Sequence, residues 1–273
     1  MLELKNVSVA AGSGNGDEVE IINNVNLSLE DKKIYVVTGP NGGGKTSLAK
    51  AIMGIYPVSN GTISLDGEDI TKRTITERAN MGIGYAFQSP TRFKGLRVRD
   101  FLTLAAFGAR EHAHAAYGTQ ERTLTSSGAP ERSADERDDE EKTLYSLLVD
   151  VGLCAQDYID RELNASFSGG ELKRVEIASI LARDLRVALL DEPEAGIDLW
   201  SFQKLTETFR QLNEACDTTI VIISHQERIL RLAHEVILIA GGRITDITSP
   251  DKILGDIDFT SPDCVCPNCN VKR

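Results

Sequence analysis

A short glycine-rich segment contains lysine and threonine at a spacing that suits phosphate binding. It reads GPNGGGKTS over residues 39–47, and the pattern Gly-x-x-x-x-Gly-Lys-Thr runs from Gly39 through Gly44 to Lys45 and Thr46. Glycines let backbone N–H groups converge on phosphate oxygens, and a following helix adds its positive end. We expect Lys45 to supply a positive charge to terminal phosphates and Thr46 to supply a hydroxyl ligand to magnesium. The candidate phosphate-binding residues are Gly39, Pro40, Asn41, Gly42, Gly43, Gly44, Lys45, Thr46 and Ser47.

Two adjacent carboxylates follow an apolar run in the segment VALLDEP, residues 187–193. Successive side chains of a strand point to opposite sides, so Asp191 and Glu192 would have different neighbours. We expect Asp191 to reach the magnesium through water, and Glu192 to orient or deprotonate an attacking water. An acidic pair at a strand end can also be a helix cap or a solvated turn, but the phosphate loop upstream favours the chemical interpretation.

A third segment, FSGGELKR over residues 167–174, places two glycines at the expected start of a helix. Ser168 and Glu171 have the spacing of a capping box, which satisfies two N–H groups at a helix start. A capping box needs no glycine between its members. Gly169 and Gly170 therefore indicate that another group approaches this helix end closely.

The elements that must position these residues alternate between strands and helices. The apolar run 33–39 is typical of a buried parallel strand, and a helix is expected directly after the phosphate loop. Residues 2–9 and 20–29 alternate apolar and polar side chains, which indicates an antiparallel pair, and a Gly-Gly turn within EVILIAGGRITDI indicates a hairpin. Further strands are expected at 61–67, 187–191 and 218–225, and a helix at 199–215. This order predicts an α/β fold with a parallel sheet, an antiparallel edge and an inserted helical part.

We expect one domain over residues 1–250, with a helical part at about 70–165 and a tail at 251–273. Within the helical part, residues 108–142 are polar and poor in large apolar side chains, which favours a mobile insertion over core structure.

Composition limits the classes of function. Hydrophobic residues make up 41% and charged residues 26% of the 273 residues, as in an ordinary globular protein. No apolar run approaches the roughly 20 residues of a membrane span, and the first residues alternate like a strand rather than like a signal peptide, so we expect a cytoplasmic protein. The net charge of −11 argues against a nucleic-acid-coating protein.

Five motifs in a fixed order resemble the nucleotide-binding subunits of ATP-binding-cassette (ABC) proteins. They are the phosphate loop, AFQSP with Gln88, FSGGE, LLDEPEAGID and IISH with His225. The resemblance covers nearly the whole chain outside 108–142 and the tail. It implies a P-loop NTPase fold of the ABC type, with an antiparallel β subdomain and an inserted helical subdomain, and Mg²⁺-dependent hydrolysis of ATP.

The same resemblance implies roles for residues away from the phosphate loop. Ser168, Gly169 and Gly170 would face the phosphates of a nucleotide held by a second copy, so that two chains pair head to tail on ATP. His225 would contact the terminal phosphate and Asp198 would communicate across the dimer. Gln88 would link the magnesium and the attacking water to the helical part. We also expect Lys173 to pair with Glu192 in the free subunit and hold it from its water, although an ordinary exposed lysine is an alternative.

A narrower resemblance concerns ERANMGIGYAFQSP, FSGGELKRVEIASILAR and SHQERIL. These segments look like the ATPase of the Suf system, which assembles iron–sulfur clusters and drives rearrangement of a scaffold of two β-helical subunits. Pro193 is instead transporter-like, and Ala10 and Ala11 replace the aromatic residue that many transport cassettes stack on adenine. The alternative is the ATP-binding subunit of an ABC membrane transporter, whose membrane partner would dock near Gln88. A DNA-repair or chromosome ATPase is disfavoured, because no long heptad region interrupts the cassette.

Three of the five cysteines lie near the end of the chain, at Cys264, Cys266 and Cys269. The CPNC part is typical of zinc or iron–sulfur sites, in which thiolates on a tight turn share a metal. A fourth ligand would have to come from Asp263, a partner or a second copy, and a terminus without metal is the alternative. Cys154 and Cys216 are expected to be ordinary buried side chains.

Overall fold

A computed structural model describes residues 1–12, 18–117, 134–215 and 218–256. A six-stranded sheet in the order β10-β9-β3-β8-β7-β6 forms the centre of the described structure. All neighbouring strands are parallel except β10, which pairs antiparallel with β9 across the turn at Gly241 and Gly242. The strands are β3 (Ile34–Thr38), β6 (Ile83–Ala86), β7 (Val187–Asp191), β8 (Thr219–Ile223), β9 (Glu235–Ala240) and β10 (Arg243–Thr248).

A second, antiparallel sheet of four strands has the order β2-β1-β4-β5. Its strands are β1 (Leu2–Gly12), β2 (Glu18–Leu29), β4 (Asn60–Leu65) and β5 (Glu68–Asp69). Helix α1 (Lys45–Met53) lies between the two sheets and buries Leu48, Ala51 and Ile52 in their shared core. The helix that follows the phosphate loop is thus held from both sides.

The far end of α1 is fixed by a buried arginine. Arg78 of α2 (Ile75–Asn80) is 1% exposed, and its Nη1 donates to the carbonyl oxygens of Ala51 and Ile52 at 2.8 and 2.7 Å. Carbonyls at a helix C-terminus have no partner within the helix, so this guanidinium satisfies them while they satisfy it.

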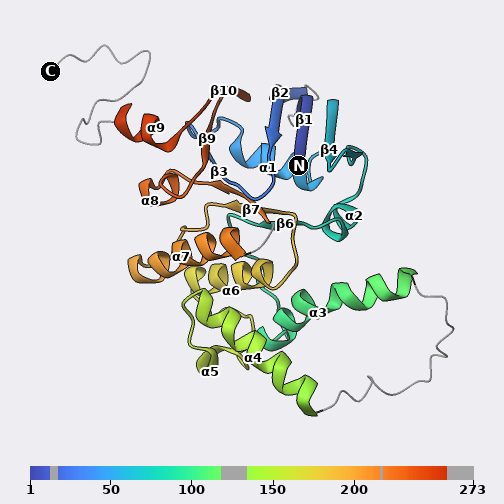
Figure 1. Cartoon of the computed structure of the whole chain (residues 1–273), viewed down its shortest axis with the longest axis vertical. Coiled ribbons are helices and arrows are strands. Elements are labelled where there is room, and N and C mark those ends of the chain that lie inside the picture. Colours follow the sequence, from blue (N-terminus) through green and yellow to red (C-terminus); the bar gives the residue numbers. More distant parts are fainter. Residues whose placement is uncertain (13–17, 118–133, 216–217, 257–273) are drawn as a thin grey trace.

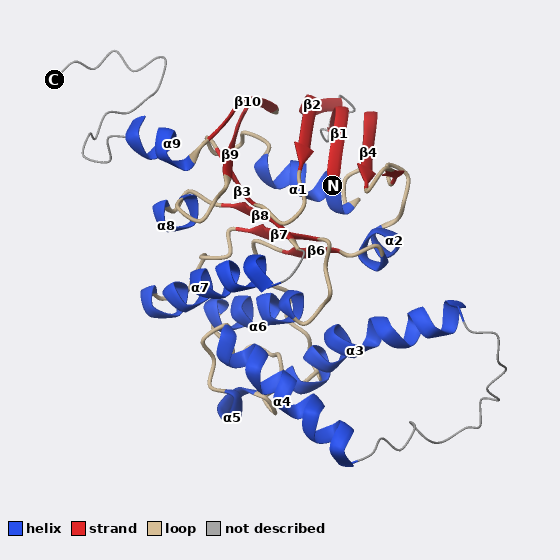
Figure 2. Ribbon diagram, in the orientation of Figure 1, coloured by secondary structure: helices blue, strands red, loops and turns tan. Residues whose placement is uncertain are grey.

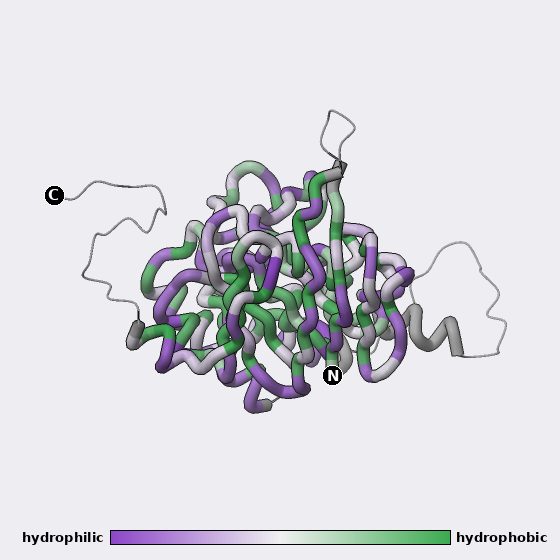
Figure 3. Tube along the Cα trace, turned by 90° about the horizontal axis from the view of Figure 1, so that it is seen from above, coloured by the Kyte–Doolittle hydropathy of each residue, from purple (hydrophilic) through white to green (hydrophobic). Residues whose placement is uncertain are grey.

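The other face of the central sheet is covered by helices (Figure 2). α6 (Gly169–Leu181) and α7 (Leu199–Ala215) pack against the sheet, and α3 (Val98–Tyr117), α4 (Ala134–Asp150) and α5 (Ala155–Tyr158) lie beyond them (Figure 1). The remaining helices are α8 (Glu227–Leu230) and α9 (Pro250–Asp256). Apolar segments are concentrated toward the middle of the molecule, as the hydropathy view shows (Figure 3). None of the helices in the described ranges is long and apolar enough to cross a membrane.

One expectation about the helical part is corrected. Strand β6 falls inside the range 70–165 but pairs with β7 in the central sheet, so the helical part begins after Ala86. Within the predicted insertion, residues 108–117 are the last part of α3 and residues 134–142 lie in the first part of α4. Residues 118–133 lie outside the described residues.

Candidate active site

The parallel strands end at one edge of the sheet, and most of the predicted catalytic and phosphate-binding residues lie at this edge. β3 leads into the phosphate loop, β6 into Phe87 and Gln88, β7 into Glu192, and β8 into Ser224 and His225. Ligand sites of open α/β sheets lie at the carboxyl ends of the strands, and the motifs therefore converge although they are far apart in the sequence.

The phosphate loop joins β3 to α1 and needs its glycines for two reasons. Gly39, Gly42 and Gly44 have φ of 138°, 74° and 105°, which L-residues rarely adopt. A Cβ on Gly39 would also lie 2.0 Å from the carbonyl oxygen of Ile239 in β9. The motif predicts the glycines, whereas the close approach of β9 is visible only in the fold.

Lys45 is folded back onto the loop that carries it. Its Nζ donates to the carbonyl oxygens of Gly39 and Pro40, at 2.8 and 3.0 Å. Burial lowers the pKa of Lys45, although nearby Glu192 and Asp191 act in the opposite direction. The ammonium group is therefore held at the place where the loop's N–H groups would meet a phosphate.

Asp191 is fully buried beneath the loop, and two hydroxyl groups donate to it. Thr46 Oγ1 donates to Oδ1 at 3.1 Å, and the Tyr85 hydroxyl donates to Oδ2 at 2.9 Å. Burial is the largest effect on this carboxyl and raises its pKa, and burial together with Asp191 raises the pKa of Tyr85. The hydroxyl and carboxylate oxygens are hard ligands of the kind that Mg²⁺ prefers, so Thr46 and Asp191 fit that ion. Sequence reasoning missed Tyr85, whose only signal was its place on the strand that leads to Gln88.

Glu192 contacts Gln88 in this structure. Gln88 Nε2 donates to Glu192 Oε2 at 2.8 Å, and the backbone N–H of Glu192 donates to Ile223 O at 3.0 Å. Glu192 has φ of 45°, a strained conformation for a residue with a side chain, and such strain of about 1–3 kcal/mol collects at functional sites. The predicted general base and the predicted linker of the helical part are thus in direct contact.

The expected pair between Lys173 and Glu192 is wrong. Lys173 is buried, and its Nζ donates to the carbonyl oxygens of Phe87 and Asp191, while Glu176 Oε2 is the nearby carboxylate at 3.5 Å. Position on α6 explains the difference, because one face of this helix packs under the strand ends instead of facing solvent.

His225 follows β8 and contacts the end of β3. Its Nδ1 lies 3.2 Å from Thr38 Oγ1. Burial and the charge of Lys45 lower the pKa of His225, which favours the neutral imidazole. Ser224, the residue before it, donates through Oγ to Glu194 Oε1 at 2.5 Å.

The start of α6 has the predicted capping box. Ser168 Oγ accepts from Glu171 N at 3.2 Å, and Glu171 Oε2 accepts from Ser168 N at 2.7 Å. The two glycines have different surroundings. A Cβ on Gly170 would lie 2.2 Å from Gly196 O, whereas a Cβ on Gly169 would meet nothing within 4 Å. Packing within the chain therefore explains Gly170, and only Gly169 faces open space.

Asp198 caps the helix that follows. Its Oδ1 accepts from the backbone N–H groups of Trp200 and Ser201 at 3.1 and 3.0 Å. Within the described ranges, no hydrogen bond joins Ser168, Gly169, Gly170 or Asp198 to the phosphate loop of the same chain. The structure thus brings together the loop, Gln88, Asp191, Glu192 and His225, and leaves the α6 start and Asp198 as a separate group.

Other candidate residues have different outcomes. Cys154 is exposed, so the expectation that it is buried is wrong: it precedes α5 on the surface of the helical part. Cys216, Cys264, Cys266 and Cys269 lie outside the described residues. Among the residues that are described, no group of three or more His, Cys, Asp or Glu could hold a metal ion.

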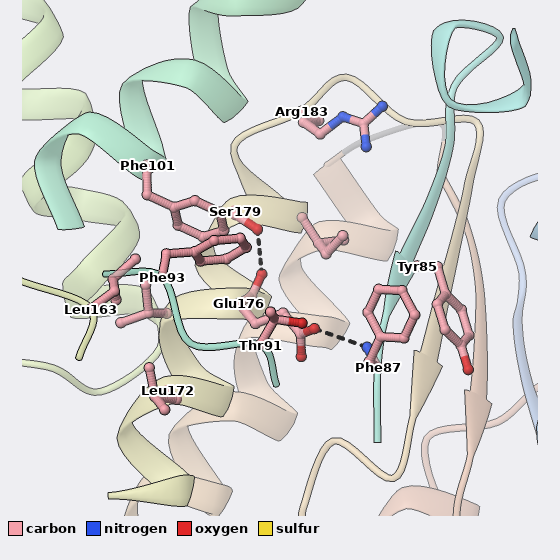
Figure 4. Close-up of a pocket in the computed structure, with 12 residues that line it drawn as sticks. Tyr85, Phe87, Thr91, Phe93, Phe101, Leu163, Leu172, Glu176, Ser179 and Arg183 are labelled. Atoms are coloured by element: carbon pink, nitrogen blue, oxygen red, sulfur yellow. Dashed lines mark hydrogen bonds between the residues drawn. The ribbon is translucent and has the colours of Figure 1, made fainter. Parts of the chain in front are cut away.

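A pocket of about 250 Å³ is lined by residues from the end of β6, from α3 and from α6. Apolar side chains form most of its wall, and Glu176 and Arg183 are the charged residues that line it (Figure 4). The aromatic members are Tyr85, Phe87, Phe93 and Phe101. Phe87, which directly precedes Gln88, is 42% exposed there.

Taken with the mixed sheets, the loop between β3 and α1 defines a P-loop NTPase fold. A model of the family described as ABC transporter matches residues 22–195, and the chain belongs to this family. It is 34% identical over 236 residues to the "Uncharacterized ABC transporter ATP-binding protein MJ0035" of Methanocaldococcus jannaschii, covering 86% of this chain and 85% of that protein. It is 32% identical over 217 residues to the "Probable ATP-dependent transporter ycf16" of Cyanidium caldarium, covering 78% of each.

Solved structures agree on the fold. A dimeric structure of MJ0796, described as a bacterial ABC transporter cassette, aligns with a TM-score of 0.75 at 22% identity, over 92% of this chain and 99% of that one. A post-hydrolysis dimer of MJ0796 with ADP and Pi aligns with a TM-score of 0.71 at 20% identity, over 92% and 99% of the two chains. The predicted ABC-type fold is confirmed, and the chain is an ABC ATPase.

Proposed function

We propose that two copies of this chain hydrolyse ATP in the cytoplasm at sites shared between them. The observation that supports this most directly is the open start of α6. Its capping box is complete and a Cβ on Gly169 would meet nothing within 4 Å, but no hydrogen bond among the described residues joins this helix end to the phosphate loop of its own chain. A helix N-terminus attracts anions, so this end suits the phosphates of a nucleotide held by a second copy.

Each residue of the strand edge then has a role in hydrolysis. Lys45 exchanges its two carbonyl partners for the terminal phosphates, and the loop N–H groups bind the phosphate oxygens. Thr46 and, through water, Asp191 would hold Mg²⁺, which neutralises phosphate charge when bound. Glu192 takes the proton of the attacking water, while Gln88 orients both Glu192 and that water. His225, kept neutral, donates a hydrogen bond to the terminal phosphate, and Asp198 of the second copy closes the site.

The catalytic assignment is tested with Glu192→Gln. The amide keeps the shape of the side chain but cannot accept the proton of water. We expect ATP binding to be retained, hydrolysis to fall by about 10²-fold or more, and a dimer to accumulate with Mg-ATP. Light scattering coupled to gel filtration measures the dimer, and hydrolysis at the parental rate would show that Glu192 is not the general base.

For the partner, we propose a soluble scaffold of the Suf type, whose two β-helical subunits assemble iron–sulfur clusters. The three segments that resemble the Suf ATPase support this choice, and one of them contains Phe87 and Gln88. The pocket lined by Phe87, the residue before Gln88, offers an apolar surface through which such a partner would act on the catalytic residues.

The second candidate is the ATP-binding subunit of an ABC membrane transporter. It is favoured by the names of the relatives, which describe an ABC transporter ATP-binding protein and a probable ATP-dependent transporter. In that case the membrane partner would dock at the same pocket.

Affinity purification of the full chain, from both the soluble and the detergent-extracted fraction, separates the candidates. Recovery of a soluble β-rich complex supports the scaffold proposal, and recovery of an integral membrane protein supports the transporter. A variant with Phe87→Ser, which removes an exposed apolar side chain from the pocket, is the matched control and should lose either partner.

We further propose that Cys264, Cys266 and Cys269 bind Zn²⁺ or an iron–sulfur cluster, with a fourth ligand from Asp263, a partner or a second copy. Thiolates at this spacing support the assignment. Metal analysis of anaerobically purified chain, alone and with its partner, tests it against a triple Cys→Ser variant. Zinc and iron at the level of that variant would rule the site out.

A further inference from the structure

Helix α6 holds both backbone polar groups of Phe87, the residue before Gln88. The backbone N–H of Phe87 donates to Glu176 Oε1 at 3.0 Å, and the carbonyl oxygen of Phe87 accepts from Lys173 Nζ. Figure 4 shows the bond between Glu176 and Phe87 at the edge of the pocket. Lys173 and Glu176 are one helical turn apart and therefore reach the same backbone segment.

Lys173 also holds the residue before Glu192. Its Nζ donates to the carbonyl oxygen of Asp191 at 3.0 Å. One ammonium group thus binds the two carbonyls that directly precede Gln88 and Glu192, the two side chains that contact each other at 2.8 Å. Lys173 thus links the backbone segments that carry those two side chains.

The two α6 residues are buried, although charges are costly to bury. The Lys173 side chain is 1% exposed and the Glu176 side chain 14%, with their charged atoms 3.5 Å apart. Replacing a buried ion pair by apolar side chains is often neutral or favourable for stability, so stability is a weak explanation for its presence here. The hydrogen bonds of Lys173 and Glu176 to the backbone of Phe87 and Asp191 indicate another role for the pair.

We propose that Lys173 and Glu176 are positioning residues that set the contact between Gln88 and Glu192 for hydrolysis. This inference rests on the proposed function. It connects the start of α6, where the second copy's nucleotide would bind, with the general base through one rigid helix. It also connects the pocket with the general base, because a partner that displaces the exposed Phe87 ring would move the backbone N–H and carbonyl groups that Glu176 and Lys173 bind.

We expect that substituting either Lys173 or Glu176 lowers kcat and leaves the KM for ATP unchanged. Glu176→Ala removes the acceptor for Phe87 N–H and should lower kcat about tenfold, the effect of one orienting hydrogen bond. Glu176→Gln keeps an acceptor oxygen and should retain most of kcat. Lys173→Met keeps length but no donor, and should also lower kcat, whereas release of Glu192 from a restraining lysine would raise it.

A double-mutant cycle separates positioning from general damage. In a Gln88→Ala background, Glu176→Ala should cause almost no further loss, because both changes act through Gln88. Glu77→Ala is the matched control: Glu77 accepts a hydrogen bond from the backbone N–H of Thr74 at 2.8 Å, as Glu176 does from Phe87, but it lies on α2 away from the strand edge. Its kcat should equal the parental value, and circular dichroism checks the fold of every variant.

Full additivity of Glu176→Ala and Gln88→Ala, an equal loss in Glu176→Gln, or a raised kcat in Lys173→Met would overturn the inference. Should Lys173→Met not fold, the Glu176 variants decide by themselves. Failure of the proposed function is seen separately. Hydrolysis by Glu192→Gln at the parental rate would contradict both the proposed function and the positioning role of Lys173 and Glu176. An inactive Glu192→Gln together with additive effects of Glu176→Ala and Gln88→Ala would contradict the positioning role alone.

Discussion

Helices α1 and α6 both have glycines at their starts, before Lys45 in α1 and at Gly169 and Gly170 in α6, and the surroundings of the two starts differ. At α1, Gly39 and Gly43 are pressed against β9, and Lys45 closes the loop with its own hydrogen bonds. At α6, Gly170 is packed against Gly196, while Gly169 and Ser168 face outward. The first start has Lys45, Thr46 and the buried Asp191 beside it. At the second start the Tyr158 hydroxyl donates to Glu171, and Arg161 lies 3.9 Å from that carboxylate. The difference fits the proposed function, in which the first start binds the phosphates of its own ATP and the second is completed by the ATP of a second copy.

The largest expected effect concerns the phosphate loop at the start of α1. Lys45→Met removes the only side-chain cation bound to the described phosphate loop, and we expect ATP hydrolysis to fall by at least about 10²-fold, with weaker nucleotide binding. Titration with a fluorescent ATP analogue measures binding. Parental hydrolysis by this variant would mean that the loop is not the phosphate site.

Substitutions of the two glycines at the start of α6 test the proposed role of this helix end directly. An added Cβ at Gly170 would clash with backbone at Gly196, so Gly170→Ala should lower the free energy of unfolding by about 1–3 kcal/mol. Gly169→Ala should change it by less than about 0.5 kcal/mol but reduce hydrolysis, since the added methyl group faces the proposed ATP of the second copy. Urea unfolding and ATPase assays are needed for both. Unchanged hydrolysis in a folded, dimeric Gly169→Ala would contradict a role of this helix end.

The caps provide a matched pair. Ser168→Ala should cost about 1 kcal/mol of unfolding free energy, as for other N-caps, and lower hydrolysis. α2 begins with the same capping box, formed by Thr74 and Glu77, and lies away from the strand edge. Thr74→Ala should therefore lower stability without lowering hydrolysis per folded molecule. Equal losses of activity in both variants would show that the Ser168 effect is one of stability alone.

The smallest expected effect concerns pH at His225. Burial and Lys45 lower its pKa in the folded chain, so below about pH 6.5 the unfolded chain binds a proton that the folded chain resists. Stability should fall as the pH drops through that value toward the lowered pKa. His225→Gln should reduce this acid sensitivity by about 1–2 °C in Tm between pH 7.5 and 5.5. An identical pH dependence of Tm in both chains would contradict the shift.

Local sequence signals predicted most elements of the fold. The apolar runs at 33–39, 187–191 and 218–225 correspond to β3, β7 and β8, and the helix expected at 199–215 is α7. β6 was missed, because four residues, IGYA, give too short a pattern to distinguish from a helix. The helices over parts of 108–142 were missed because they lack the apolar stripe by which a helix is recognised.

The sequence by itself determined the chemistry of the site: motif spacing identified Lys45, Thr46, Asp191 and Glu192, since a phosphate loop must be local and continuous. Tertiary structure decided which of these residues meet and what holds them. The contact of Gln88 with Glu192, the Tyr85 hydroxyl on Asp191 and the position of Lys173 depend on the pairing of β6 with β7 and on the packing of α6. No local pattern records such contacts, because they join segments about a hundred residues apart that come together only when the sheet forms.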